Sequence, residues 1–184
     1  MGLYLVRHGA TEWSTSGRHT STTDLPLLPE GEQAAKELAP RLAGLDFAAV
    51  LTSPRMRARR TAELAGFPDA VVEEDLAEWR YGEYEGVTTE EIHRTDPTWN
   101  IWDGVTPGGE SAEEVAARLD RVVAAARERD GDTLVFAHGH SLRVLAARWL
   151  GQPAAYGRNF WLGTATLSVL GEDRGQPVVV RWNC

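Results

Sequence analysis

The chain opens with Leu3-Tyr4-Leu5-Val6-Arg7-His8-Gly9, an apolar run that ends in an arginine, a histidine and a glycine. A short run of β-forming apolar residues closed by glycine predicts a buried strand. Far downstream, Thr133-Leu134-Val135-Phe136-Ala137 is followed by His138-Gly139 in the same way. Open α/β folds bind ligands at the carboxyl ends of their strands, so we expect both imidazoles to face one crevice.

The segments between these two strands alternate between helical and strand patterns. Apolar residues recur at helical spacing over residues 29–45, where Pro40 should kink the helix, and residues 48–51 predict a second strand. Ser53 and Pro54 are typical of an N-cap and a first helical residue, so they predict a helix that runs to about Ala65. Arg57 would lie near the first turn of that helix.

The rest of the chain continues the alternation. Val71-Val72 predicts a brief strand, residues 76–86 have no clean period and predict a loop, and Ser111 with Glu114 forms a capping box before an amphipathic helix. We expect a further helix over residues 142–150 and closing strands over 165–170 and 178–182. This order predicts a three-layer α/β/α sandwich on a largely parallel sheet, with residues 1–184 forming one domain.

Composition limits the classes of partner. The formal charge is 19 minus 27, or −8, which disfavours nucleic acid and anionic membranes. No run approaches the roughly 20 apolar residues of a membrane span, and no basic-then-apolar leader precedes the first strand, so we expect a cytoplasmic protein. The one cysteine, Cys184, allows no internal disulfide and no thiol cluster for zinc. The oligomeric state stays open.

The paired histidines suggest phosphoryl transfer. A histidine with an ordinary pKa of about 6.5 can be a neutral nucleophile or a protonated anion binder near neutral pH. Two further segments, residues 53–62 and 78–86, extend the pattern into a family resemblance. The chain resembles the histidine phosphatase superfamily, the phosphoglycerate mutase-like proteins, in four blocks that come in the family's order: residues 5–13, 53–62, 78–86 and 137–140.

The resemblance implies a role for each matching residue. His8 would be the nucleophile that forms a phosphohistidine, Arg7 and Arg57 the phosphate clamps, and His138 the second histidine of the pocket. Glu78 would be the acid that protonates the leaving group. The helix after Gly139 would add N–H groups and a partial positive charge that favour anions, and Ser14 and Thr20 lie where the family places polar contacts to phosphate. No metal and no cofactor are expected.

Several alternatives stay open beside these assignments. Glu83 and Glu85 compete with Glu78 for the acid role, although Glu78 precedes Gly82 at the family's spacing. His138 and His140 could suggest a metal pair, but no third ligand is evident, and pocket-wall polarity is the better interpretation. Arg55, Arg59 and Arg60 are interpreted as a solvated helix face. Trp99 and Trp102 are interpreted as anchors in the core or in a lid rather than as a platform for a sugar.

Departures from the family pattern bear on the reaction. Ala10 occupies a position where mutases usually carry Glu or Gln, and residues 87–107 contain no lysine and only Arg94. A poorly capped site admits water, which favours hydrolysis over phosphate return to a second hydroxyl. We therefore expect a phosphatase for small phosphorylated metabolites, most similar to the sedoheptulose-1,7-bisphosphatase group and related bacterial acid phosphatases. A cofactor-dependent phosphoglycerate mutase and an inactive phosphate-binding module are the alternatives.

Overall fold

The central sheet has six strands in the order β3-β2-β4-β1-β5-β6. A computed structural model describes residues 2–184. The parallel part comprises β1 (Leu3–Arg7), β2 (Phe47–Thr52), β3 (Val71–Val72) and β4 (Asp132–Ala137). The last two strands, β5 (Leu167–Asp173) and β6 (Gln176–Arg181), run antiparallel at one edge.

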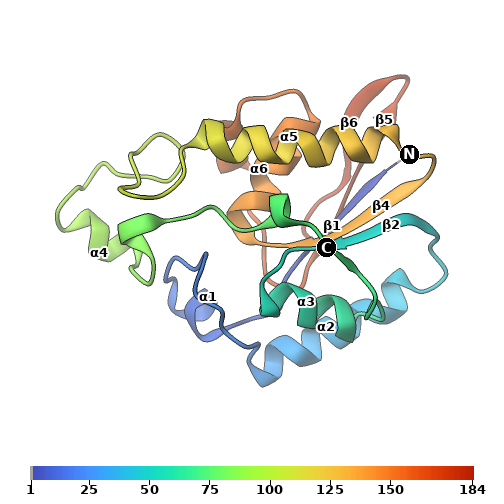
Figure 1. Cartoon of the computed structure of the whole chain (residues 1–184), viewed down its shortest axis with the longest axis horizontal. Helices are drawn as coiled ribbons and strands as arrows, with labels where there is room; N and C mark the ends of the chain where they lie inside the picture. The colour runs from blue at the N-terminus through green and yellow to red at the C-terminus, as the bar shows by residue number, and fades with distance from the viewer. Residues whose placement is uncertain (1) are drawn as a thin grey trace.

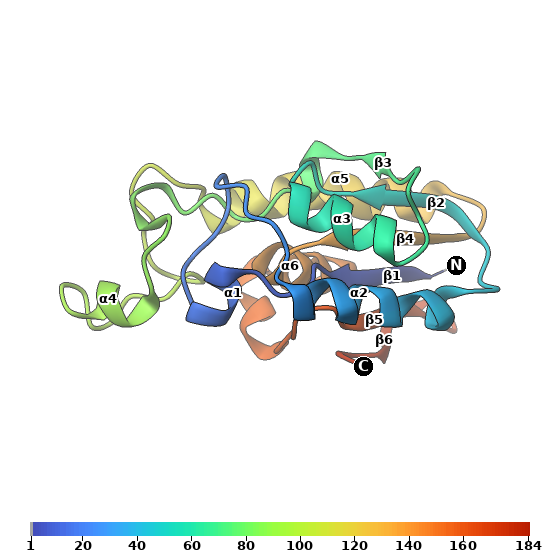
Figure 2. The ribbon, with the colours of Figure 1, turned by 90° about the horizontal axis from the view of Figure 1, so that it is seen from below.

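Helices cover both faces of this sheet, as Figures 1 and 2 show. On one face, α2 (Pro29–Leu42) and α3 (Met56–Leu64) bury Leu38 and Ala62 against β4. On the other face, α5 (Ala112–Glu128) and α6 (Gly139–Trp149) bury their apolar faces against β1 and β4. The expected α/β/α sandwich on a mostly parallel sheet is confirmed.

Two one-turn helices were not expected from the sequence. They are α1 (Glu12–Ser16) and α4 (Thr89–His93), and each begins with a capping box. Five residues are too few to display helical periodicity, and only their caps could have indicated them. Figures 1 and 2 both show α4 beyond the end of the sheet. The segment expected to be a loop, residues 76–86, contains a 3-10 turn at Gly82–Tyr84, and two further 3-10 turns lie at Glu74–Leu76 and Ala154–Asn159.

Helix boundaries near the sheet edge differ from the prediction. Ser53 is not the N-cap of α3: Arg55 is, and the N–H of Met56 donates to the Asp24 carboxylate at 2.9 Å. Likewise α6 begins at Gly139 rather than at residue 142, with His138 as its N-cap residue. At the other end of the fold, α2 runs through Pro40 but ends at Leu42, not at residue 45.

The strand register decides where the two histidines lie. Leu3 pairs with Thr133 and Arg7 with Ala137, so the next residues along the two strands, His8 and His138, leave the sheet side by side. The N–H of His8 donates to the Ala137 carbonyl at 3.0 Å, which extends the pairing past the ends of both strands. Within residues 2–184, no helix has both the length and the apolar character needed to cross a bilayer.

Candidate active site

The two strand-end histidines face each other. Their ring centroids are 5.2 Å apart with the planes inclined by 61°. His8 is 5% exposed and His138 is fully buried. The structure therefore brings together the pair that the sequence placed at matching strand ends.

His8 has a defined tautomer. Its Nδ1 lies 2.7 Å from the Gly9 carbonyl, which can only accept, so Nδ1 carries the proton and Nε2 keeps its lone pair. Burial lowers the pKa of His8 well below 6.5, and the nearby guanidinium groups of Arg57 and Arg7 lower it further. The neutral ring is the form that can act as a nucleophile. Gly9 has no room for a side chain, because an added Cβ would lie 2.4 Å from the Gly31 carbonyl oxygen.

His138 is held by Ser53, the residue whose sequence context predicts a helix cap. Its Nε2 lies 2.7 Å from Ser53 Oγ, while its Nδ1 is buried and has no partner among residues 2–184. Burial lowers the pKa of His138 well below 6.5, and the charge of Arg57 adds to the effect. Ser53 thus orients the second imidazole, a role that no local sequence signal indicates.

Backbone carbonyls hold the two arginines at the site. Arg7 donates from Nη1 to the Leu162 carbonyl at 2.6 Å, and Arg57 donates from Nη1 to Thr23 at 3.0 Å and from Nη2 to Thr20 at 3.1 Å. Arg57 is fully buried. Burial lowers the pKa of both arginines, but a guanidinium stays charged in proteins. In both side chains Nε is buried without a partner in the described chain.

Glu78 lies at the start of α6. Its Oε1 accepts from the N–H groups of Trp79 at 2.9 Å and Ser141 at 2.7 Å, and its Oε2 accepts from His140 N–H at 3.0 Å. The carboxylate thus caps the helix that follows His138, where the helix dipole favours negative charge. Each carboxylate oxygen offers two acceptor positions, so Oε2 keeps one free.

The polar residues expected around a phosphate also lie at this site. Ser14 Oγ completes the α1 capping box with Thr11, and Thr20 donates from Oγ1 to the Arg18 carbonyl. An added Cβ on Gly139 would lie 3.4 Å from Arg7 Cζ, so the first residue of α6 lies against the guanidinium. The hydroxyls of Ser14 and Thr20 thus bond locally.

Six of the eight expected site residues line one cavity of about 230 Å³: Arg7, His8, Ser14, Thr20, Glu78 and Gly139. Arg57 and His138 do not line it; they are fully buried. Sequence reasoning missed several other lining residues, among them Arg18, Tyr81 and Arg143. Arg143 lies one helical turn after Gly139, a spacing that could have revealed it once the helix start was known.

The competing carboxylates lie elsewhere. Neither Glu83 nor Glu85 lines the cavity. Glu85 accepts from the N–H groups of Ser21 and Thr23, so it fixes the loop that carries the carbonyls bound by Arg57. No group of three potential metal ligands occurs in the part of the chain that the structure describes.

The two tryptophans differ in environment. Trp99 is 4% exposed and packs edge-on against His19 and Tyr84, so it belongs to the core. Trp102 is half-buried, with the Arg143 guanidinium 4.6 Å from its ring centroid.

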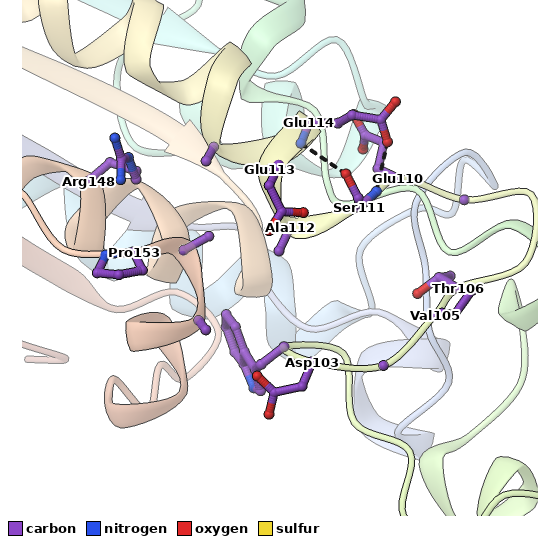
Figure 3. A pocket seen from close by; sticks show the side chains of 16 residues that line it. Asp103, Val105, Thr106, Glu110, Ser111, Ala112, Glu113, Glu114, Arg148 and Pro153 are labelled. Atoms are coloured by element: carbon purple, nitrogen blue, oxygen red, sulfur yellow. Dashed lines mark hydrogen bonds between the residues drawn. The ribbon is translucent and has the colours of Figure 1, made fainter.

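A larger cavity of about 780 Å³ lies at the N-terminal end of α5 and is drawn in Figure 3. Three of the four carboxylates that line it have partners: Asp103 pairs with Arg158, Glu110 with Arg118, and Glu114 completes the capping box with Ser111. No histidine lines it. The smaller cavity therefore holds the reactive side chains.

Comparisons with known proteins agree with this geometry. Residues 3–184 match the family model described as histidine phosphatase superfamily (branch 1). The chain is 43% identical to an acid phosphatase of Mycobacterium tuberculosis over 94% of this chain and 87% of that protein. It is 38% identical to sedoheptulose 1,7-bisphosphatase of Saccharomyces cerevisiae over 80% of this chain and 66% of the yeast protein. The solved structure of an open reading frame from M. tuberculosis superposes with a TM-score of 0.96 at 39% identity, covering 99% of this chain and 96% of that one.

Proposed function

This chain belongs to the histidine phosphatase superfamily, and from that premise we propose that it is a metal-independent phosphomonoesterase. Its substrates would be small phosphorylated metabolites, sugar phosphates above all, and the reaction would pass through a phosphohistidine on His8. Relatives named as phosphatases support the hydrolase class.

One observation carries the proposal. Three buried nitrogen atoms at the site have no partner among residues 2–184: Arg7 Nε, Arg57 Nε and His138 Nδ1. Leaving a buried polar group unpaired costs about 1–3 kcal/mol, so three at one site favour a ligand rich in acceptor oxygens. With the Ser53 hydroxyl donating to Nε2, His138 would carry its proton on Nδ1. A phosphoryl group offers the acceptors that these donors need.

The proposed first step transfers the phosphoryl group to the protein. The Nε2 lone pair of His8 attacks phosphorus, a P–N bond forms, and the P–O bond to the leaving group breaks. The two arginines and the N–H of Gly139, the first residue of α6, stabilise the charge on the equatorial oxygens, because the next two N–H groups of the helix donate to Glu78. Glu78, protonated on Oε2, gives its proton to the departing alkoxide.

The second step restores the enzyme. Glu78, now a carboxylate, takes a proton from water as the water oxygen attacks phosphorus, the P–N bond breaks, and inorganic phosphate leaves. No group in this cycle needs a metal ion, because arginine side chains and backbone dipoles supply the positive charge.

Residues 87–107 contain few basic side chains, and this favours hydrolysis over a phosphoglycerate mutase reaction. Arg94 is their only basic residue apart from His93, and it does not line the cavity of His8. No cluster of arginine and lysine from this segment is available to grip a carboxylate or to cap a phosphoenzyme. The inactive-module alternative is disfavoured because His8, Arg7, Arg57, Glu78 and His138 are all present.

The test is phosphate release from a panel of sugar phosphates, phosphoglycerates and nucleotides. We expect phosphate release from sugar phosphates. Isomerisation of 3-phosphoglycerate without phosphate release would identify a mutase instead. Phosphate binding with no turnover of any ester would identify a binding module.

A further inference from the structure

His140 lines the cavity of His8 and is half-buried there. It is the second residue of α6, and its backbone N–H donates to Glu78 Oε2. The ring therefore leaves the helix beside the carboxylate that would handle the leaving-group proton. Neither proposed step of the reaction uses this ring.

Tyr81 fixes one nitrogen of the ring. The Tyr81 hydroxyl oxygen lies 2.6 Å from His140 Nδ1 and makes no other hydrogen bond in the described chain. Tyr81 is only 2% exposed. If the hydroxyl accepted a proton from Nδ1, its own hydrogen would have no acceptor in the described chain, which is costly for a group this buried. The hydroxyl therefore donates to Nδ1, and the ring proton lies on Nε2.

The opposite nitrogen is free to contact a ligand. His140 Nε2 makes no hydrogen bond within residues 2–184, and it is not among the buried atoms sealed from solvent. Burial lowers the pKa of His140 well below 6.5, and the positive charge of Arg143 lowers it further. The ring thus presents one uncharged N–H donor at the cavity.

We propose that His140 determines specificity by donating its Nε2–H to a hydroxyl oxygen of the substrate's leaving group other than the ester oxygen, and that Tyr81 is the positioning residue that holds the ring in this tautomer. The inference rests on the proposed phosphatase function and deepens it. It names the favoured substrates as phosphate esters of hydroxylated alcohols, such as polyols and sugars. A site built to hydrogen-bond an oxygen of the substrate discriminates against analogues that lack it.

His93 provides a matched control. Its Nε2 bonds to the Trp99 carbonyl at 2.7 Å, inside the protein, and it does not line the cavity. Replacing His93 removes a comparable hydrogen bond but no proposed contact to substrate.

The kinetic test compares glycerol 3-phosphate with n-propyl phosphate, two alkyl esters that differ in their hydroxyl groups. We expect His140→Phe to lower the ratio of kcat/KM for glycerol 3-phosphate to kcat/KM for n-propyl phosphate about fivefold, the size of one neutral hydrogen bond. His140→Gln, whose amide N–H lies near the position of Nε2, should restore much of the loss. His93→Phe should leave the ratio of the two substrates unchanged. An equal loss on both esters in His140→Phe would show a structural role and overturn the proposal.

The tautomer can be measured without turnover. Long-range ¹H–¹⁵N correlation spectra should show the His140 proton on Nε2 in the wild type and a mixture of tautomers in Tyr81→Phe. A wild-type proton on Nδ1 would overturn the assignment. Calorimetric binding of the same two esters to His8→Ala separates this inference from the proposed function: a preference for glycerol 3-phosphate that His140→Phe removes supports the subsite even if no ester is hydrolysed, and no preference contradicts it.

Discussion

Replacing Glu78 by glutamine separates the chemical role of this carboxylate from its structural one. Glutamine retains one acceptor oxygen, which can keep the bonds from Trp79 and Ser141, while its NH₂ group would face the N–H of His140. One buried N–H loses its acceptor, which costs about 1–3 kcal/mol of unfolding free energy. For a chain of this length that lowers Tm by about 2–12 °C. Glu78→Gln should therefore remain folded at assay temperature.

The activity loss should depend on the leaving group. A general acid contributes about 10²–10⁴-fold when the leaving alkoxide is a poor one. We expect Glu78→Gln to slow hydrolysis of sugar or glycerol phosphates by roughly 10²-fold or more. The rate of hydrolysis of p-nitrophenyl phosphate should fall much less, because its phenolate leaves without a proton near neutral pH. The assay is kcat/KM for both substrates in wild type and variant.

Glu83 and Glu85 supply the controls. Glu83→Gln should leave kcat/KM for both substrates unchanged. Glu85→Gln should lower the stability of the fold, because Glu85 accepts hydrogen bonds from Ser21 and Thr23. Equal slowing of both substrates by Glu78→Gln would refute the acid assignment. If Glu83→Gln or Glu85→Gln showed the leaving-group dependence instead, the acid would have to be reassigned within residues 78–86.

Three further outcomes follow from the same geometry. Exhaustive chelation with EDTA should leave phosphate release undiminished, because arginines and a helix N-terminus supply the positive charge; a loss restored by one divalent metal would contradict this. Ser53→Ala should lower both kcat/KM and unfolding free energy, the latter by about 1–3 kcal/mol, because the buried His138 Nε2 loses its partner; unchanged urea unfolding and activity would remove Ser53 from the site. The folded-state pKa values of His8, His138 and His140 lie below 6.5, so the unfolded chain binds more protons and stability should fall as pH drops below about 6.5. Urea unfolding at pH 7.5 and 5.5 checks that sign, and greater stability at pH 5.5 would refute it.

Local patterns predicted the sheet and the histidine pair well. The apolar runs before His8 and His138 became neighbouring parallel strands, and the capping box at Ser111 and Glu114 begins α5 as expected. These features depend on residues close together in the chain. Periodicity and local caps are therefore enough to indicate them.

Features that depend on distant residues were missed. The helices α3 and α6 begin at the candidate site, and carboxylates far away in sequence cap both: Asp24 for α3 and Glu78 for α6. The local capping pattern at Ser53 therefore placed the start of α3 wrongly, and the start of α6 was predicted at residue 142 instead of Gly139. Ser53 was assigned to the wrong partner for the same reason, since its bond to His138 joins residues 85 positions apart.

The most direct test of the account is to trap the phosphoenzyme. Wild-type protein quenched in acid-free denaturant during turnover of ³²P-labelled substrate should retain label in an alkali-stable, acid-labile bond, and peptide mapping should locate that label on His8. His8→Ala should retain no label and no turnover, although it stays folded. Label on another residue, or full activity of His8→Ala, would contradict the central claim that His8 Nε2 is the nucleophile.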